Sequence, residues 1–103
     1  MRTVLVEYTL SPGADTEDVE RHIRDFIAGI RALDVGVWYT SHRVPGEGRS
    51  YKHVGFMPNE EAQAKLVGAP FFGPFGQYLR TMTVEPPRVT WLDVVATTAQ
   101  TTP

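Results

Sequence analysis

The stretch from Val37 to Met57 constrains the fold most, because it has the pattern of two strands joined by a tight turn. The turn is Val44-Pro45-Gly46-Glu47-Gly48-Arg49, in which proline presets φ and glycine tolerates positive φ. Pairing Val44 with Arg49 sets the predicted register. The partners that follow are His42 with Tyr51, Thr40 with His53, and Trp38 with Gly55.

This hairpin has two chemically different faces, since side chains alternate along a strand. In the predicted register, one face is polar, aromatic and titratable and carries Trp38, Thr40, His42, Tyr51 and His53. The other face is apolar enough to belong to a core and carries Val37, Tyr39, Val54 and Phe56.

The rest of the chain supplies two more strands and two helical segments. Alternation predicts strands over 3–10 and 88–96, and apolar residues at helical spacing predict a helix from Asp15 or Thr16 to Leu33. Asn59 is placed to begin a second helix, which glycines and prolines interrupt over 68–76 and which ends near Met82. The predicted order is therefore β-α-β-β-α-β.

That order is typical of a ferredoxin-like split βαβ fold of the α+β class. Right-handed crossovers place both helices on one face of a four-stranded antiparallel sheet. We expect one domain over residues 1–97 and a flexible polar tail over 98–103. The opposite sheet face is predicted to carry Trp38, His42, Tyr51, His53, Trp91 and Asp93, which is too aromatic to stay in water, so we expect a homodimer that stacks two such faces into an α+β barrel.

Composition excludes several classes of function. The net charge of −2 and the scattered basic residues argue against nucleic acid or an anionic membrane as partner. No cysteine is present, so thiolate metal sites and a cysteine nucleophile are excluded, and a cytoplasmic location is expected. Neither a phosphate-binding glycine loop nor a serine nucleophile elbow occurs.

The interrupted second helix is the main argument for a ligand site, because a broken helix leaves a gap over the sheet. The candidate ligand-binding residues around it are Tyr8, Phe26, Tyr39, Phe56, Phe72, Phe75, Tyr78 and Arg80. A small hydrophobic or aromatic ligand would suit them. The alternative is that they form an ordinary core.

The two hairpin histidines also allow two interpretations. His42 and His53, with Asp93 or Glu7, could bind a metal, or one imidazole could act as a base. The favoured interpretation is that both pack in the dimer barrel, so we predict no metal site. Likewise, Trp38 and Trp91 could stack on a planar ligand, but they are more typical of interface anchors.

The chain resembles the dimeric α+β barrel superfamily, and within it the antibiotic-biosynthesis-monooxygenase-like and stress-responsive barrel proteins. The resemblance covers nearly the whole chain, and the segments that carry it are Val4-Leu5-Val6-Glu7-Tyr8, Pro12-Gly13, Tyr51-Lys52-His53-Val54-Gly55-Phe56, Glu60-Glu61-Ala62 to Leu66, Ala69-Pro70-Phe71-Phe72 and Pro86-Pro87. It implies two facing sheets and a ligand pocket between sheet and helices. Several such proteins oxidise polycyclic phenols or haem without a conventional redox cofactor.

Many members of these families carry a tryptophan at the start of the second helix region and a histidine on that helix, and haem-degrading members have an asparagine in the first strand. This chain departs from that pattern. Its segment 56–75 contains neither tryptophan nor histidine, and its first strand has no asparagine, which argues against haem degradation.

Two hypotheses remain. The first is a cofactor-independent monooxygenase-like enzyme, or a related isomerase or cyclase, acting on an aromatic or polyketide-like molecule. The second is a non-catalytic dimeric ligand-binding or stress-associated barrel, and an enclosed pocket with a positioned base would favour the enzyme.

Overall fold

The computed structural model describes residues 1–98 of the chain. Of the predicted tail over 98–103, all but the first residue lies outside the described residues. The elements follow the order β1 (Arg2–Thr9), α1 (Thr16–Leu33), β2 (Trp38–Arg43), β3 (Ser50–Met57), α2 (Glu60–Val67), α3 (Phe72–Met82) and β4 (Arg88–Asp93).

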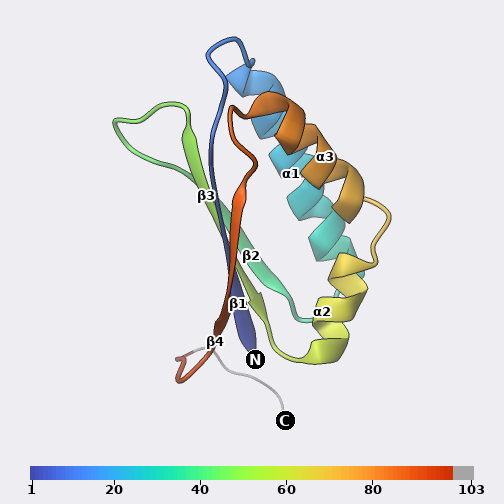
Figure 1. Cartoon of the computed structure of the whole chain (residues 1–103). Coiled ribbons are helices and arrows are strands. Elements are labelled where there is room, and N and C mark those ends of the chain that lie inside the picture. The colour runs from blue at the N-terminus through green and yellow to red at the C-terminus, as the bar shows by residue number, and fades with distance from the viewer. Residues whose placement is uncertain (99–103) are drawn as a thin grey trace.

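The four strands form one antiparallel sheet in the order β2-β3-β1-β4. Figure 1 shows all three helices on the same side of this sheet. The predicted α+β, ferredoxin-like β-α-β-β-α-β fold is thus confirmed, with α2 and α3 as the two parts of the interrupted second helix. The other sheet face is left uncovered by the described chain, and it is called the open face below.

Helix α1 begins and ends where local chemistry dictates. The Asp15 carboxylate accepts hydrogen bonds from the amides of Glu17 and Asp18 and so caps the first turn. The helix ends at Asp34, whose left-handed backbone (φ 49°) closes the last turn. The buried face of α1 packs on the sheet through Val19, Ile23, Phe26 and Ile30.

The break between α2 and α3 lets the aromatic start of α3 dock on α1. Asn59 caps α2, which ends at Gly68, and Pro70 follows before α3 begins. A side chain on Gly29 of α1 would lie 2.8 Å from the ring of Phe71, so glycine there is what allows that ring to lie against the helix. The interruption is therefore a packed junction.

The predicted hairpin register is wrong by one residue. Val44 pairs with Ser50, from whose carbonyl it is 2.9 Å, and Ser41 lies opposite His53. The cause is Arg49, whose carbonyl accepts a hydrogen bond from Leu10 and whose guanidinium donates to the carbonyls of Ser11 and Ala14. Arg49 therefore belongs to the β1–α1 corner, and the hairpin loop is one residue longer than predicted.

A shift of one residue exchanges the faces of a strand. Tyr51 and His53, predicted on the dimer-barrel face, lie on the helix-facing side of β3, and Phe56, predicted as a ligand-binding residue, lies on the open face with Val54. Trp38 and His42 lie on the open face as predicted.

The predicted faces of β4 are also exchanged. Trp91 lies opposite Val4, and Asp93 lies opposite Arg2, to which it forms an ion pair at 3.3 Å. Both therefore lie on the helix-facing side, whereas Leu92 is on the open face. The error arose because the pattern of β4 is apolar on both sides, so alternation alone could not fix its pairing with β1.

Gly55→Ala is expected to destabilise the fold by about 1–3 kcal/mol, because overpacking forces neighbours apart. A Cβ at Gly55 would lie 2.7 Å from the ring of Tyr39 and 2.9 Å from Val4. Urea denaturation measures the change. Gly48→Ala is the matched control, since a Cβ there meets nothing within 4 Å. Equal stability of the two variants would show that Tyr39 does not rest on Gly55.

Candidate active site

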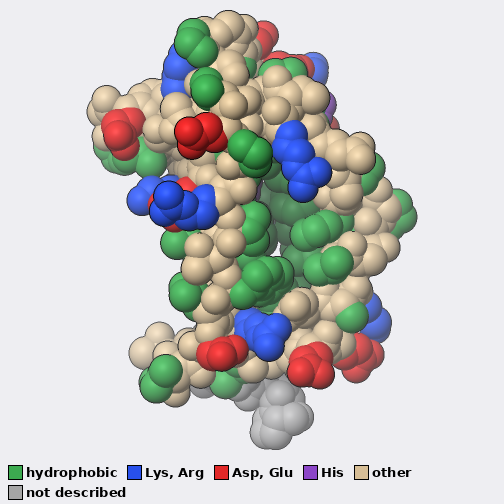
Figure 2. All heavy atoms as spheres, viewed as in Figure 1, with side chains coloured by type: hydrophobic (Ala, Val, Ile, Leu, Met, Phe, Trp, Pro, Cys, Tyr) green, Lys and Arg blue, Asp and Glu red, His purple; other side chains and the backbone are tan. Residues whose placement is uncertain are grey.

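An apolar cavity of about 220 Å³ lies between the sheet and the helices. Figure 2 shows it as a hollow beside β4, with apolar side chains inside and charged ones at the rim. The predicted ligand-binding residues that line it are Phe26, Tyr39, Phe72, Phe75 and Arg80. Leu66, Val89 and Trp91 complete much of the remaining wall.

The cavity opens where the helices stop short of β4. Val89 and Trp91 point to the helix side of the sheet, yet they remain 54% and 40% exposed. On the opposite wall, Gly76 of α3 carries no side chain that would fill the space. The cavity is thus a consequence of helix placement, as the broken second helix had indicated.

A histidine held between two tyrosines forms the polar end of this cavity. His53 is fully buried, with Nε2 2.8 Å from the Tyr8 hydroxyl and Nδ1 2.9 Å from the Tyr39 hydroxyl. The tyrosines come from the two strands that flank β3, and Tyr39 reaches across Gly55, the residue opposite it. His53 and Tyr39 both line the cavity.

Burial keeps all three of these groups neutral. Loss of solvent lowers the pKa of His53 to about 4, and the charge of His42 adds to this effect. Burial likewise raises the pKa of Tyr8 and of Tyr39 well above the ordinary value of a phenol. At neutral pH the site therefore holds an uncharged imidazole and two uncharged hydroxyls.

Tyr8 also contacts Tyr51, which belongs to a second polar cluster with Glu20 and Arg43. Its ring stacks on Tyr51 with centroids 5.6 Å apart, and the Tyr51 hydroxyl donates to Glu20 at 2.7 Å. Arg43 binds the same carboxylate through two nitrogens. The hydrogen bond from Tyr51, followed by that from Arg43, lowers the pKa of Glu20.

A larger hollow, of about 380 Å³, also borders Tyr8 but has different chemistry. Its walls include Glu7, Thr9 and Lys52, which alternate with the helix-facing residues and so point to the open face. It therefore lies on the side of the sheet opposite the Tyr8 ring. Tyr8 and Tyr51 are the buried titratable residues in its lining, but their rings lie on the helix-facing side of the sheet.

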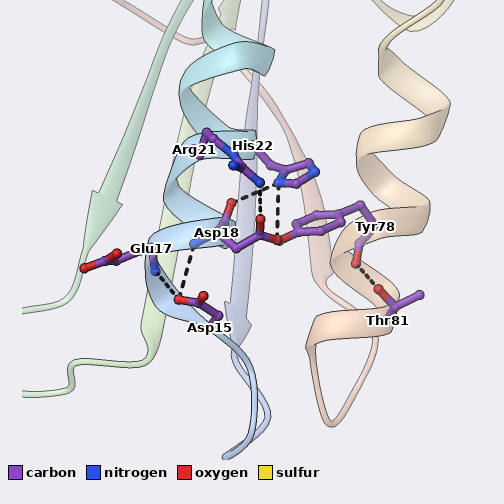
Figure 3. A network of polar contacts seen from close by, with 7 residues as sticks. All are labelled: Asp15, Glu17, Asp18, Arg21, His22, Tyr78 and Thr81. Atoms are coloured by element: carbon purple, nitrogen blue, oxygen red, sulfur yellow. Dashed lines mark hydrogen bonds and ion pairs between the residues drawn. The ribbon is translucent and has the colours of Figure 1, made fainter.

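Tyr78 lies outside the lining of the 220 Å³ cavity. Figure 3 shows its hydroxyl directed at Asp18, which also binds Arg21 and lies beside His22. The Tyr78 and His22 rings stack with centroids 3.7 Å apart, and the hydrogen bond from Tyr78 is the main cause of the lowered pKa of Asp18. This network ties α1 to α3 on the outer side of the helices.

Sequence reasoning missed His53 and Trp91 as cavity residues, because both were assigned to the wrong face. His42 and His53 lie on opposite faces of the sheet, so they cannot share a ligand.

Across residues 1–98, no group of three or more metal-ligating side chains of the His, Cys, Asp or Glu type comes together. Within the same residues, no helix is long and apolar enough to cross a membrane.

The sequence matches no protein-family model and no curated protein. Solved structures do match. A proposed antibiotic biosynthesis monooxygenase from Caulobacter crescentus superimposes with a TM-score of 0.80 at 21% identity, covering 92% of this chain and 90% of that one. SnoaB, a cofactor-independent oxygenase from Streptomyces nogalater, gives 0.75 at 17% identity over 96% and 97% of the two chains.

The chain shares their fold. A further antibiotic biosynthesis monooxygenase structure gives a TM-score of 0.81 at 14% identity, covering 93% of this chain and all of that one. The resemblance to antibiotic-biosynthesis-monooxygenase-like proteins is thereby confirmed at the level of the fold. Because a fold hosts many functions, the activity has to be argued from the cavity itself.

The free energy of unfolding is expected to fall by about 2 kcal/mol between pH 7.5 and pH 5 on account of His53. An unfolded histidine takes up a proton near pH 6.5, whereas folded His53 does so only near pH 4. The unfolded state therefore binds more protons in this interval, and stability drops as the pH falls. Urea denaturation at both pH values measures the drop.

His53→Gln is the matched variant for this measurement, because it removes the titrating group and leaves His22 and His42 in place. Its pH dependence should be flatter than that of the wild type by the same amount. An unchanged slope would mean that His53 is not buried in the folded protein.

Proposed function

We propose that this protein is a cofactor-independent monooxygenase-like enzyme that acts on a small aromatic or polyketide-like phenol. The observation that supports it most is the apolar cavity with a buried, uncharged His53 and Tyr39 at its inner end. Strongly shifted pKa values that coincide with a cavity are typical of functional sites. The shared fold with a cofactor-independent oxygenase adds general support.

The cavity suits a planar ligand of modest size. Phe26 and Phe75 stack with centroids 4.1 Å apart, Phe72 adds aromatic surface on the helix side, and Trp91 adds it from β4 on the opposite wall. A volume of about 220 Å³ is below the 300–1,000 Å³ that is typical of pockets for drug-sized ligands. We therefore expect a substrate of about two fused rings.

The proposed reaction uses the substrate as the reductant of O₂. For 1-naphthol as a probe, one naphthol and one O₂ give one 1,4-naphthoquinone and one water. One oxygen atom enters the ring as the new carbonyl, and the other leaves as water. The step becomes easier when the phenol is held as its phenolate, which is more readily oxidised than the neutral phenol.

Two groups could stabilise that phenolate. Arg80 lines the cavity from α3 and supplies a permanent positive charge near its mouth, and Tyr39 supplies a hydroxyl at its inner end. Fixed charges and dipoles act most strongly where water is excluded. The apolar walls would also keep reactive oxygen intermediates away from bulk water.

A non-catalytic ligand-binding barrel remains the second candidate. The same aromatic walls would bind a planar molecule without any chemistry, and the fold is compatible with either role. The two candidates differ in what happens to a bound phenol in air. The first predicts oxygen consumption, and the second predicts binding alone.

We further propose that the open face joins two copies of the chain. Its apolar side chains include Leu5, Val54 and Phe56 in the centre and Trp38 and Leu92 at the two edges. Trp38 is 60% exposed and Leu92 is 46% exposed, and exposed apolar surface of this kind is typical of an association surface. Two copies would cover it reciprocally about a twofold axis.

Filling the cavity should abolish oxidation. Gly76→Leu, which adds a side chain to the cavity wall, is expected to lower naphthol-dependent oxygen uptake at least about tenfold, since a misfitting pocket loses most substrate positioning. An oxygen electrode measures the uptake with no added cofactor, and absorbance measures the quinone. The test includes 1-naphthol, 2-naphthol and a dihydroxynaphthalene.

Gly73→Leu is the matched control on the same helix. A Cβ at either glycine meets nothing within 4 Å, but only Gly76 lines the cavity. The control should keep wild-type uptake. Binding of these phenols with no oxygen uptake above the protein-free rate would contradict the monooxygenase proposal and support the ligand-binding alternative.

Trp38→Glu should convert the dimer to a monomer, because it places a charge on the proposed interface. Sedimentation velocity at micromolar concentration measures the mass. Val95→Glu, which changes a fully exposed valine beyond β4, is the control and should stay dimeric. A wild-type protein that sediments as a monomer would contradict the proposal.

A further inference from the structure

The Tyr8–His53–Tyr39 chain holds one hydrogen-bond donor more than it uses. A neutral imidazole has one N–H and one lone pair, and each tyrosine hydroxyl has one proton to donate. The chain therefore contains three donor protons but forms only two hydrogen bonds, at 2.8 Å and 2.9 Å. One hydroxyl proton is left over in either tautomer of His53.

The tautomer decides where the spare proton lies. With the proton on Nε2, His53 donates to Tyr8 and accepts from Tyr39, so the spare hydroxyl proton belongs to Tyr8. With the proton on Nδ1, His53 accepts from Tyr8 and donates to Tyr39, and the spare proton belongs to Tyr39. Both arrangements satisfy the same two distances.

The surroundings of the two tyrosines are different. Tyr8 is buried in a cluster with Val19, Ile23 and Leu79, and His53 is the hydrogen-bond partner of its hydroxyl. Tyr39 lines the cavity. A buried hydroxyl proton without an acceptor is costly, whereas one at a cavity can meet a ligand. The tautomer with the proton on Nδ1 is therefore favoured.

We infer that His53 is held as the Nδ1–H tautomer and that Tyr39 presents its hydroxyl proton to an acceptor oxygen of the ligand, such as a carbonyl, phenolate or enolate oxygen. Tyr39 is then the ligand-binding group, and His53 and Tyr8 are positioning residues that act through it. This inference rests on the ligand cavity of the proposed function, and it adds the chemical group that the cavity recognises.

The common direction of the hydrogen bonds in the Tyr8–His53–Tyr39 chain makes the Tyr39 hydroxyl a stronger donor. Tyr8 donates to Nε2, Nδ1–H donates to Tyr39, and Tyr39 donates to the ligand, so all three bonds point toward the cavity. Hydrogen bonds aligned in one direction polarise one another in a buried site. The Tyr39 hydroxyl should therefore bind a negatively charged oxygen more tightly than a neutral one. A phenol acquires that negative charge when it loses its proton before oxidation.

The tautomer can be measured directly on the wild-type protein. Long-range proton–nitrogen NMR correlations of the ¹⁵N-labelled chain distinguish a protonated from an unprotonated ring nitrogen. We expect Nδ1 of His53 to be protonated and Nε2 to be unprotonated at pH 7. Protonation of Nε2 instead would overturn the inference without any variant being made.

Binding of a matched pair of probes tests the role of Tyr39. 1-Tetralone and tetralin have the same two-ring skeleton, but only the ketone has an acceptor oxygen. Calorimetry should show the ketone bound about tenfold more tightly by the wild type, the effect expected of one hydrogen bond. Tyr39→Phe should remove this preference for the ketone over tetralin, and a retained preference would overturn the inference.

Tyr8→Phe separates positioning from packing. It leaves Tyr39 intact but removes the donor to Nε2, so the NMR pattern of the His53 ring should change and the ketone preference should shrink. A packing role alone would weaken both probes equally and leave the ring pattern unaltered, which would count against the inference.

The outcomes distinguish this inference from the proposed function. Loss of the ketone preference in Tyr39→Phe, with no oxygen uptake by the wild type, would support the inference and refute the oxygenase. Oxygen uptake by the wild type, with the ketone preference kept in Tyr39→Phe, would do the reverse.

Discussion

The hydrogen bonds of Arg49 to the β1–α1 corner set the register on which the site depends. By accepting from Leu10 and donating to Ser11 and Ala14, Arg49 is held away from the hairpin pairing, and Val44 pairs with Ser50. A shift of one residue in this hairpin would put Tyr39 and His53 on opposite faces of the sheet. A contact at the surface end of the sheet thus decides whether Tyr39 can meet His53 in the cavity.

The fold could be predicted from the sequence because several independent signals agree. The alternation of β1, the cap at Asp15, the break between α2 and α3 and the order of elements all indicate the same architecture. The faces of β3 and β4 could not be predicted, because both strands carry aromatic or apolar residues on each side. Arg49 forms hydrogen bonds with residues more than thirty positions away in the sequence. The residues of the turn itself give no indication of these partners.

The candidate site was therefore predicted in part. Phe26, Tyr39, Phe72, Phe75 and Arg80 line the cavity as expected from the gap in the second helix, whereas Phe56 lies on the open face. His53 was predicted to pack in the dimer barrel, yet it is the buried polar group between Tyr8 and Tyr39 on the helix-facing side. Burial lowers the pKa of His53, so the imidazole is neutral at pH 7. A neutral imidazole has one donor and one acceptor nitrogen, so its tautomer decides which tyrosine keeps a free hydroxyl proton.

The register of the β2–β3 hairpin is the feature on which the Tyr39–His53 hydrogen bond and the role of Tyr39 both rest. Cross-strand nuclear Overhauser effects between backbone protons measure it most directly. The expected contacts pair Ser41 with His53 and Tyr39 with Gly55. Contacts that pair Thr40 with His53 and Trp38 with Gly55 would put Tyr39 and His53 on opposite faces of the sheet and contradict it.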